Sequence, residues 1–223
     1  MKKKVIITLL LDNPQSWMVP FANKLEKLFH NRGYKVVRSE NALKIPHGEC
    51  VFFLSCEKIV SEKILKRNRH NIVIHASHLP EGKGFSPMTW LILEGKNEIP
   101  LTLFEAVAKV DSGPIYLRDR VLFEGHELIG DLRKVLGEKI VEMAVKFIDN
   151  YKSQIGTLPK GKATFYPRIR AKDSLVDTSK PIKDIFSRLR VADNAKYPVF
   201  FDFKNHRYIL KIYRRDNYLA DKI

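Results

Sequence analysis

Residues 71–90 read Asn71-Ile-Val-Ile-His75-Ala-Ser77-His78-Leu-Pro80-Glu-Gly-Lys83-Gly84-Phe-Ser86-Pro87-Met-Thr-Trp90. The apolar run that ends at His75 predicts a buried strand, and a loop rich in glycine and proline follows it. Ser86 and Pro87 suit the N-cap and the first position of a helix, and Gly95 suits its end. A strand that opens through such a loop into a helix is the usual layout of a site at the carboxyl end of a strand in an α/β fold.

The first half of the chain alternates between strands and helices. Apolar runs that predict strands cover residues 5–11, 34–37, 50–56 and 72–75. Segments with helical spacing cover residues 18–29 and 59–66. This alternation favours an α/β fold, in which helices pack on both faces of a parallel sheet. Beyond Gly95, two β-prone segments at 99–107 and 114–123 lead into a long amphipathic helix over 140–151.

The chain divides into a main domain and a small appendage. We expect the main domain to cover residues 1–152. Residues 153–162 are polar and glycine- and proline-containing, which suits a linker across the surface. Residues 163–223 contain two β-prone runs, 197–203 and 208–213, on either side of a Lys-Asn-His turn. They predict a small subdomain that contains a β-hairpin.

Composition indicates a soluble globular protein in a reducing compartment, most simply the cytoplasm. The 223 residues are 44% hydrophobic and 29% charged, and no run approaches the roughly 18 apolar residues of a membrane span. Cys50 and Cys56 form no Cys-x-x-Cys pair, which argues against disulfide and zinc frameworks. The net charge of +15 attracts anions of any kind, although a solvated basic surface explains it equally well.

A motif spread over two segments carries the resemblance to a known family. His75, Ser77, Leu79-Pro80, Gly84 and Pro87 are followed by Val110-Asp111-Ser112-Gly113. This order and spacing resembles the formyltransferases that use N10-formyltetrahydrofolate, over about residues 50 to 150. The resemblance weakens in the first 45 residues. It implies a Rossmann-like core with a mixed, mostly parallel sheet, reduced folate as the co-substrate, and no resident metal.

The resemblance places the catalytic histidine and aspartate of the family at His75 and Asp111. Formyl transfer to an amine passes through a tetrahedral intermediate, which needs an oxyanion donor and a proton shuttle. Histidine changes charge near neutral pH and can serve as the shuttle. Taken singly, His75 is also explained as a histidine at a strand end, and Asp111 as a turn aspartate. His75-x-x-His78 lacks a third ligand with zinc spacing.

One position departs from the family pattern. The family carries an asparagine two residues before the histidine, where this chain has Val73. Loss of such an oxyanion donor costs about 3 to 4 kcal/mol in other enzymes. Asn71 lies roughly 13 Å from His75 along an extended strand and is too far to substitute. We expect Ser77, Ser86 or a loop N–H to serve instead; the alternative is a catalytically inactive binding protein.

The tail of the chain points to the acceptor. Residues 165–177 read Phe165-Tyr-Pro-Arg168-Ile-Arg170-Ala-Lys-Asp173-Ser174-Leu-Val-Asp177, which resembles a segment of sugar N-formyltransferases. The resemblance implies an amino deoxysugar linked to a nucleotide, most simply a UDP-sugar formylated at a 4-amino group in a pathway of the pseudaminic acid type. A methionyl-tRNA formyltransferase is the alternative; the short tail argues against it, and we expect neither nucleic acid nor membrane as a partner.

Ligand contacts are expected from two sets of residues. For the nucleotide sugar, the candidates are Asn13, Trp17, Lys58, Lys83, Arg168, Arg190 and Tyr197. For the folate, the resemblance implies a pterin pocket formed by Phe85, Ala108, Val110, Asp111 and Gly113. Each has an ordinary structural explanation, since exposed lysines are usually solvated and aromatic residues usually pack. The Phe200, Phe201 and Phe203 cluster suits either a homodimer contact or packing within the subdomain.

Overall fold

A computed structural model describes residues 4–215 and contains one six-stranded central sheet. Its strands, in the order in which they lie across the sheet, are β2 (Lys35–Ser39), β1 (Ile6–Leu10), β3 (Gly48–Phe53), β4 (Asn68–His75), β6 (Glu98–Glu105) and β7 (Ile115–Leu122). The first four strands run parallel, whereas β6 and β7 are antiparallel to their neighbours. The predicted α/β class with a mixed, mostly parallel sheet is confirmed.

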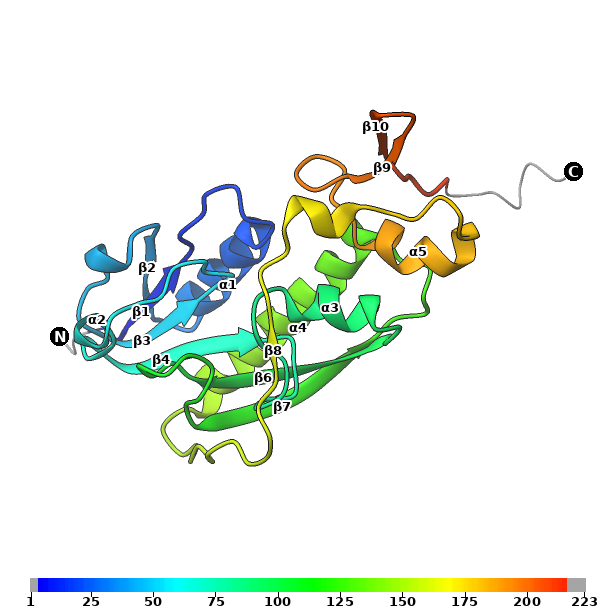
Figure 1. Ribbon diagram of the computed structural model, residues 1–223. Coiled ribbons are helices and arrows are strands. Elements are labelled where there is room, and N and C mark those ends of the chain that lie inside the picture. Colours follow the sequence, from blue (N-terminus) through cyan, green and yellow to red (C-terminus); the bar gives the residue numbers. More distant parts are fainter. Residues whose placement is uncertain (1–3, 216–223) are drawn as a thin grey trace, which may run out of the picture.

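Helices cover both faces of this sheet (Figure 1). On one face lie α1 (Val19–Asn31), α3 (Pro87–Leu93) and α4 (Ile129–Asn150), whose apolar residues form one core cluster with Ile7 and Leu9 of β1. On the other face lie η1 (Ala42–Lys44) and α2 (Glu62–Leu65). Apolar residues on both faces of β1 and β3 explain why these strands read as apolar runs in the sequence.

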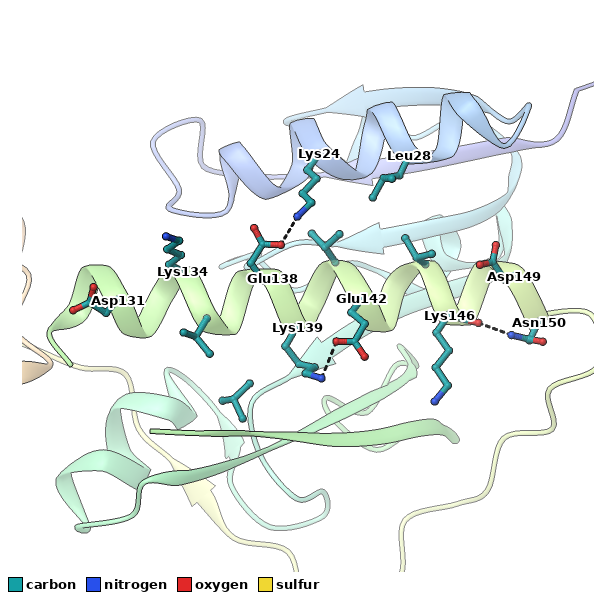
Figure 2. A pocket seen from close by; sticks show the side chains of 14 residues that line it. Lys24, Leu28, Asp131, Lys134, Glu138, Lys139, Glu142, Lys146, Asp149 and Asn150 are labelled. Atoms are coloured by element: carbon teal, nitrogen blue, oxygen red, sulfur yellow. Dashed lines mark hydrogen bonds and ion pairs between the residues drawn. The ribbon is translucent and has the colours of Figure 1, made fainter. Parts of the chain in front are cut away.

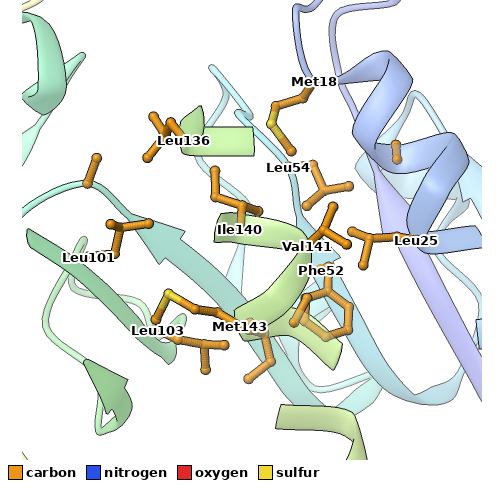
Figure 3. Packing of buried hydrophobic residues seen from close by; sticks show 14 of the residues in the cluster. Met18, Leu25, Phe52, Leu54, Leu101, Leu103, Leu136, Ile140, Val141 and Met143 are labelled. Atoms are coloured by element: carbon orange, nitrogen blue, oxygen red, sulfur yellow. The ribbon is translucent and has the colours of Figure 1, made fainter. Parts of the chain in front are cut away.

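The main core lies between α1, α4 and the sheet (Figure 3). Phe29 and Phe52 stack with ring centroids 5.6 Å apart, and Phe147 of α4 meets Phe52 edge to face. All three side chains are fully buried. Truncation of any one to alanine is expected to cost about 3 to 5 kcal/mol.

Helix α4 is longer than its apolar spacing predicts and begins at Ile129 rather than near residue 140. The Asp131 carboxylate accepts a hydrogen bond from the Leu128 N–H and so caps the first turn. Gly137 lies in this extra portion, where an added Cβ would come within 2.4 Å of the Phe21 ring of α1. The close approach of α1 and α4 therefore requires glycine at this position.

The C-terminal segment returns to the main domain before it forms its own elements. Strand β5 (Lys83–Gly84) pairs in parallel with β8 (Phe165–Tyr166). Figure 1 shows the chain after α4 running back along the sheet to reach β8 and then α5. The later elements are η2 (Ala171–Ser174), α5 (Ile182–Arg190), β9 (Val199–Phe203) and β10 (His206–Leu210).

Strands β9 and β10 form the predicted antiparallel hairpin, with Lys204 and Asn205 in left-handed backbone at its turn. Helix α5 and the β5–β8 pair were not predicted. Phe201 stacks on Tyr208 within the hairpin, and Phe203 remains exposed. Within residues 4–215, no helix combines the length and the apolar character that a bilayer crossing requires.

Candidate functional site

A pocket of about 560 Å³ opens where the parallel strands end. Three of its walls are the loops that follow β1, β3 and β4, and a fourth is the first half of α4. Residues from the C-terminal segment close the remaining side: Arg168, Ile169, Asp193, Lys196 and Tyr197. The carboxyl ends of parallel strands are the usual place for ligands in an α/β sheet, so this pocket is the candidate active site.

His75 lies at the last position of β4 and lines the pocket. Its Nε2 lies 2.9 Å from the Gly82 carbonyl oxygen and 4.0 Å from Asp111 Oδ2. A carbonyl oxygen can only accept, so Nε2 carries the hydrogen. The two side chains are only 11% and 12% exposed. The fold thus brings together the two residues expected to be catalytic.

Asp111 is fixed by the same loop. Its Oδ2 accepts the Gly84 N–H at 2.9 Å, and its own backbone is left-handed, with φ of 49°. Glycine is required two residues further on, at Gly113, because an added Cβ would lie 1.8 Å from the Glu105 carbonyl oxygen. The tight turn and the loop contact together hold the carboxylate against His75.

The structure limits which group could take the place of the family's asparagine as the oxyanion donor. Val73 does not line the pocket; it packs against Leu79, Phe104 and Ile115. Ser77 is also excluded, because its hydroxyl is buried without a partner among the described residues and lies outside the pocket lining.

Loop N–H groups are excluded as well, since those of residues 81–85 all donate to protein acceptors. Ser86 is the remaining candidate. It is exposed in the pocket wall, and its backbone is left-handed with φ of 50°, so its side chain does not cap α3 as the sequence predicted. The hydroxyl is therefore left for a ligand.

One end of the pocket is basic, and its arginine is positioned by an ion pair. Arg168 Nη1 lies 3.1 Å from Glu57 Oε2, and the Arg168 guanidinium stacks 4.4 Å over the Phe85 ring. Asn13 donates to the other Glu57 oxygen at 3.3 Å. The hydrogen bonds from Arg168 and Asn13 lower the pKa of Glu57 and keep it ionised.

Two basic residues of this end were not predicted. Arg133 of α4 pairs with Asp193 at 2.8 Å, and Lys196 donates to the Gln15 carbonyl at 3.1 Å. Tyr197 lines the pocket beside Lys196, as does Trp17 on the loop after β1. Nothing in their sequence neighbourhood marks Arg133 or Lys196, since the first sits in an amphipathic helix and the second in a turn.

Three predicted cations lie outside the pocket lining, which corrects the sequence interpretation. Lys83 is 4% exposed, and its Nζ donates to the Ser112 hydroxyl at 2.6 Å. Arg190 is 3% exposed and pairs with Glu127 at 2.8 Å. Lys58 is exposed, and its backbone N–H donates to the Asp12 carboxylate. Both Asp12 oxygens hold the 57–58 turn, so Asp12 anchors the loop.

The residues expected around the pterin divide between two places. Phe85 lines the pocket, whereas Ala108, Val110 and Gly113 lie on the loop between β6 and β7, outside that lining. Asp111 connects the two places through its contact with the Gly84 N–H.

Residues 15–147, more than half of the 223-residue chain, match the sequence pattern of the family described as formyl transferase. The chain belongs to the formyl transferase family. The match contains His75 and Asp111 and ends before the strand β8, which pairs with β5 in the loop after His75.

Relatives within the formyl transferase family include the methionyl-tRNA formyltransferase of Thermotoga maritima. It is 29% identical over 156 residues, which cover 68% of this chain and 50% of the relative. This chain spans about half the length of the curated relatives that it matches.

Solved structures show the same fold at low sequence identity. Methionyl-tRNA formyltransferase from Clostridium thermocellum has a TM-score of 0.80 at 18% identity, covering 97% of this chain and 95% of that one. A 4-N formyltransferase from Francisella tularensis has a TM-score of 0.69 at 17% identity, with 93% and 97% coverage. HypX from Aquifex aeolicus in complex with tetrahydrofolic acid has a TM-score of 0.78 at 15% identity, with 94% and 38% coverage.

A second hollow, of about 980 Å³, runs along the outer face of α4, with α1 on one side and Val121 of β7 on the other (Figure 2). Its charges largely satisfy one another: Lys24 pairs with Glu138, and Lys139 pairs with Glu142. It contains no histidine, cysteine or serine, so it offers no acid, base or nucleophile comparable with the His75 pocket. Across residues 4–215, no three His, Cys, Asp or Glu side chains gather in a metal-binding group.

Proposed function

We propose that this protein transfers a formyl group from N10-formyltetrahydrofolate to the amino group of a nucleotide-linked amino deoxysugar. The observation that carries the proposal is the His75–Asp111 pair, held by one loop at the edge of a 560 Å³ pocket. That volume lies within the usual range for small-molecule sites.

The reaction follows from the geometry of the pair. The acceptor amine attacks the formyl carbon, a C–N bond forms, and the carbonyl oxygen becomes an oxyanion. The Ser86 hydroxyl donates to that oxyanion in place of the family's asparagine. His75 donates Nε2–H to Gly82, so its Nδ1 lone pair accepts the amine proton. Asp111 stabilises the imidazolium, and N10 takes up the proton as its bond to carbon breaks.

The basic end of the pocket supports a diphosphate-linked acceptor. Arg168, Lys196 and Arg133 converge there, and arginine forks suit phosphate oxygens. Trp17 and Tyr197 would stack on the base. A UDP-sugar with a 4-amino group, of the kind used in pseudaminic acid type pathways, fits this description, and the fold shared with a 4-N formyltransferase supports it.

The folate assignment rests on family membership and on the fold shared with a tetrahydrofolic acid complex. Phe85 would form an apolar wall for the pterin, and the loop containing Ala108, Val110 and Gly113 would supply backbone contacts. Lys58, in the turn after β3, stays a candidate only for a ligand that extends beyond the pocket.

Methionyl-tRNA is the second candidate acceptor, and two observations favour it. The chain carries a net charge of +15, and its curated relatives are methionyl-tRNA formyltransferases. A basic protein binds polyanions by counterion release, so affinity for tRNA would fall steeply with added salt.

The test is formyl transfer from N10-formyltetrahydrofolate to a panel of nucleotide-linked 4-amino-6-deoxysugars, with methionyl-tRNA as a parallel acceptor, read by mass spectrometry. We expect the mass of one sugar to rise by one formyl group and that of methionyl-tRNA to stay unchanged. Transfer to methionyl-tRNA alone would overturn the sugar assignment. No transfer to any acceptor would favour an inactive binding protein with Val73 as its mark.

A further inference from the structure

A short segment outside the family-matched region holds the loop that carries the chemistry. This segment, which we call the strap, comprises residues 164–167. The Thr164 carbonyl accepts the Lys83 N–H at 3.0 Å, and the Tyr166 carbonyl accepts the Phe85 N–H at 3.1 Å. Trp90 Nε1 donates to the Pro167 carbonyl at 2.9 Å. The strap therefore contacts both the loop after β4 and the helix that follows it.

The contact is too close to be incidental. Gly84 lies so near the strap that an added Cβ would come within 2.4 Å of the Tyr166 carbonyl oxygen. The Tyr166 ring stacks on Trp90 with an interplanar angle of 13°, and its hydroxyl donates to Glu94 at 2.8 Å. Backbone pairing, ring stacking and a side-chain hydrogen bond thus fix the strap from both ends.

One side chain of the strap connects it to the catalytic histidine. Thr164 Oγ1 accepts the Gly82 N–H at 2.8 Å. The Gly82 carbonyl oxygen accepts Nε2–H of His75 at 2.9 Å. Gly82 is buried, so a lost partner for its N–H would not simply be replaced by bulk water. Thr164 thereby holds the peptide groups on both sides of Gly82. Its Oγ1 accepts from the Glu81–Gly82 group, and its carbonyl accepts from the Gly82–Lys83 group, whose own carbonyl selects the His75 tautomer.

We infer that Thr164 is a positioning residue, which acts through Gly82 to hold the His75 ring in its Nε2–H form with Nδ1 available as the base. The inference rests on the proposed formyl transfer. It assigns a catalytic contribution to a part of the chain that lies beyond residues 15–147. It also explains why the chain crosses back over the sheet before it forms the hairpin.

The test compares Thr164→Val with Thr164→Ser in the full chain. Valine keeps the shape of the side chain but removes the oxygen that accepts the Gly82 N–H. We expect kcat to fall about tenfold, as one lost hydrogen bond would produce, while KM for both substrates stays within about twofold. Serine restores Oγ and should restore kcat. Thr157→Val is the matched control, since the exposed Thr157 joins Ile115 only through its backbone.

A spectroscopic readout separates positioning from simple support of the fold. The ¹⁵N signals of the His75 ring should report Nε2–H in the wild type and in Thr164→Ser. In Thr164→Val they should show a mixture with the Nδ1–H form, and the Gly82 amide should exchange faster with deuterium.

Two outcomes would overturn the inference. One is an unchanged kcat and tautomer in Thr164→Val. The other is a loss of thermal stability that accounts for the whole loss of activity and leaves the ring signals unchanged. Failure of the proposed function is a distinct result, because the wild type would then transfer no formyl group while the ring signals still responded to Thr164→Val.

Discussion

His75 Nε2 and Asp111 Oδ2 lie 4.0 Å apart, and neighbouring peptide groups of one loop hold each of them. The Gly82 carbonyl accepts from His75, and the Gly84 N–H donates to Asp111. The distance between the two side chains is therefore set by a three-residue stretch of backbone. Side-chain packing around the pair adds to this arrangement but does not create it.

Asp111→Asn should remove the negative charge beside His75 while keeping the position of the side chain. The asparagine can still accept the Gly84 N–H, but it cannot stabilise an imidazolium. We expect kcat to fall by about a hundredfold to ten-thousandfold, with little change in fold. Steady-state kinetics with circular dichroism would check this. Retention of activity within threefold would show that the carboxylate has no electrostatic role.

Replacement of Ser86 tests the oxyanion donor. Ser86→Gly and Ser86→Ala both remove the hydroxyl, but only glycine adopts φ of 50° without strain. We expect both to lower kcat by about a hundredfold. Asn205→Gly is the control, because it relaxes left-handed backbone in the hairpin turn, outside the pocket. A normal kcat for Ser86→Gly would mean that another group donates to the oxyanion.

Val73→Asn introduces the asparagine of the family at a position that is apolar in this protein. Val73 packs against Leu79, Phe104 and Ile115, so an amide there would lack hydrogen-bond partners. We expect a loss of about 1 to 3 kcal/mol in the free energy of unfolding, and no gain in kcat. Urea denaturation and kinetics would measure both. A higher kcat would mean that the side chain can turn into the pocket.

The affinity of the basic end of the pocket for its ligand should fall at acidic pH. Contacts with Arg168 and Asn13 lower the pKa of Glu57 below its ordinary value of 4.5. A lowered carboxyl pKa contributes stability that is complete above 4.5 and is lost as pH falls through the folded value. We therefore expect affinity for the nucleotide sugar to decline below pH 4.5, and Glu57→Gln to remove part of that dependence. Isothermal titration between pH 3 and 7 would show a flat profile if the pairing is irrelevant.

Arg190 and Lys196 should give opposite phenotypes. Arg190 pairs with Glu127 in the interior and also donates to Asn97 at 2.7 Å. Arg190→Met removes the ion pair of the half-buried Glu127, which keeps its hydrogen bonds from the Glu124 and Gly125 N–H groups, and it also leaves Asn97 without this donor. The loss should cost about 1 to 3 kcal/mol of stability. Lys196→Met should instead raise KM for the sugar and leave the melting temperature unchanged. If Arg190→Met were stable but had a raised KM for the sugar, Arg190 would contact the ligand after all.

The sequence was most informative where local pattern and structure have the same cause. Apolar runs with both faces buried predicted β1, β3 and β4, and the glycine- and proline-rich loop after His75 indicated where the site lies. The hairpin was predicted from two β-prone runs around Lys204-Asn205. The early start of α4 was missed because Gly130 and Gly137 weaken its helical pattern. Close packing of α4 on α1 compensates at Gly137.

Lysines and arginines were the least predictable part of the site. Lys83 and Arg190 resemble ligand contacts in sequence, yet each is buried and bonded within the protein. Arg133 and Lys196 carry no local signal, yet both line the pocket. Long flexible side chains reach many places from one backbone position, so their function depends on which neighbours the fold supplies.

The sequence by itself determined the alternation of strands and helices in the first half of the chain and the formyl transferase pattern that contains His75 and Asp111, because these depend on residue type and spacing along the chain. Only the tertiary structure decided that Ser86 lines the pocket without capping α3, which cations line the pocket, and that the strap at residues 164–167 contacts the loop that holds His75. Those features depend on contacts between segments far apart in sequence. No local pattern encodes them, since each partner is positioned by the packing of the whole domain.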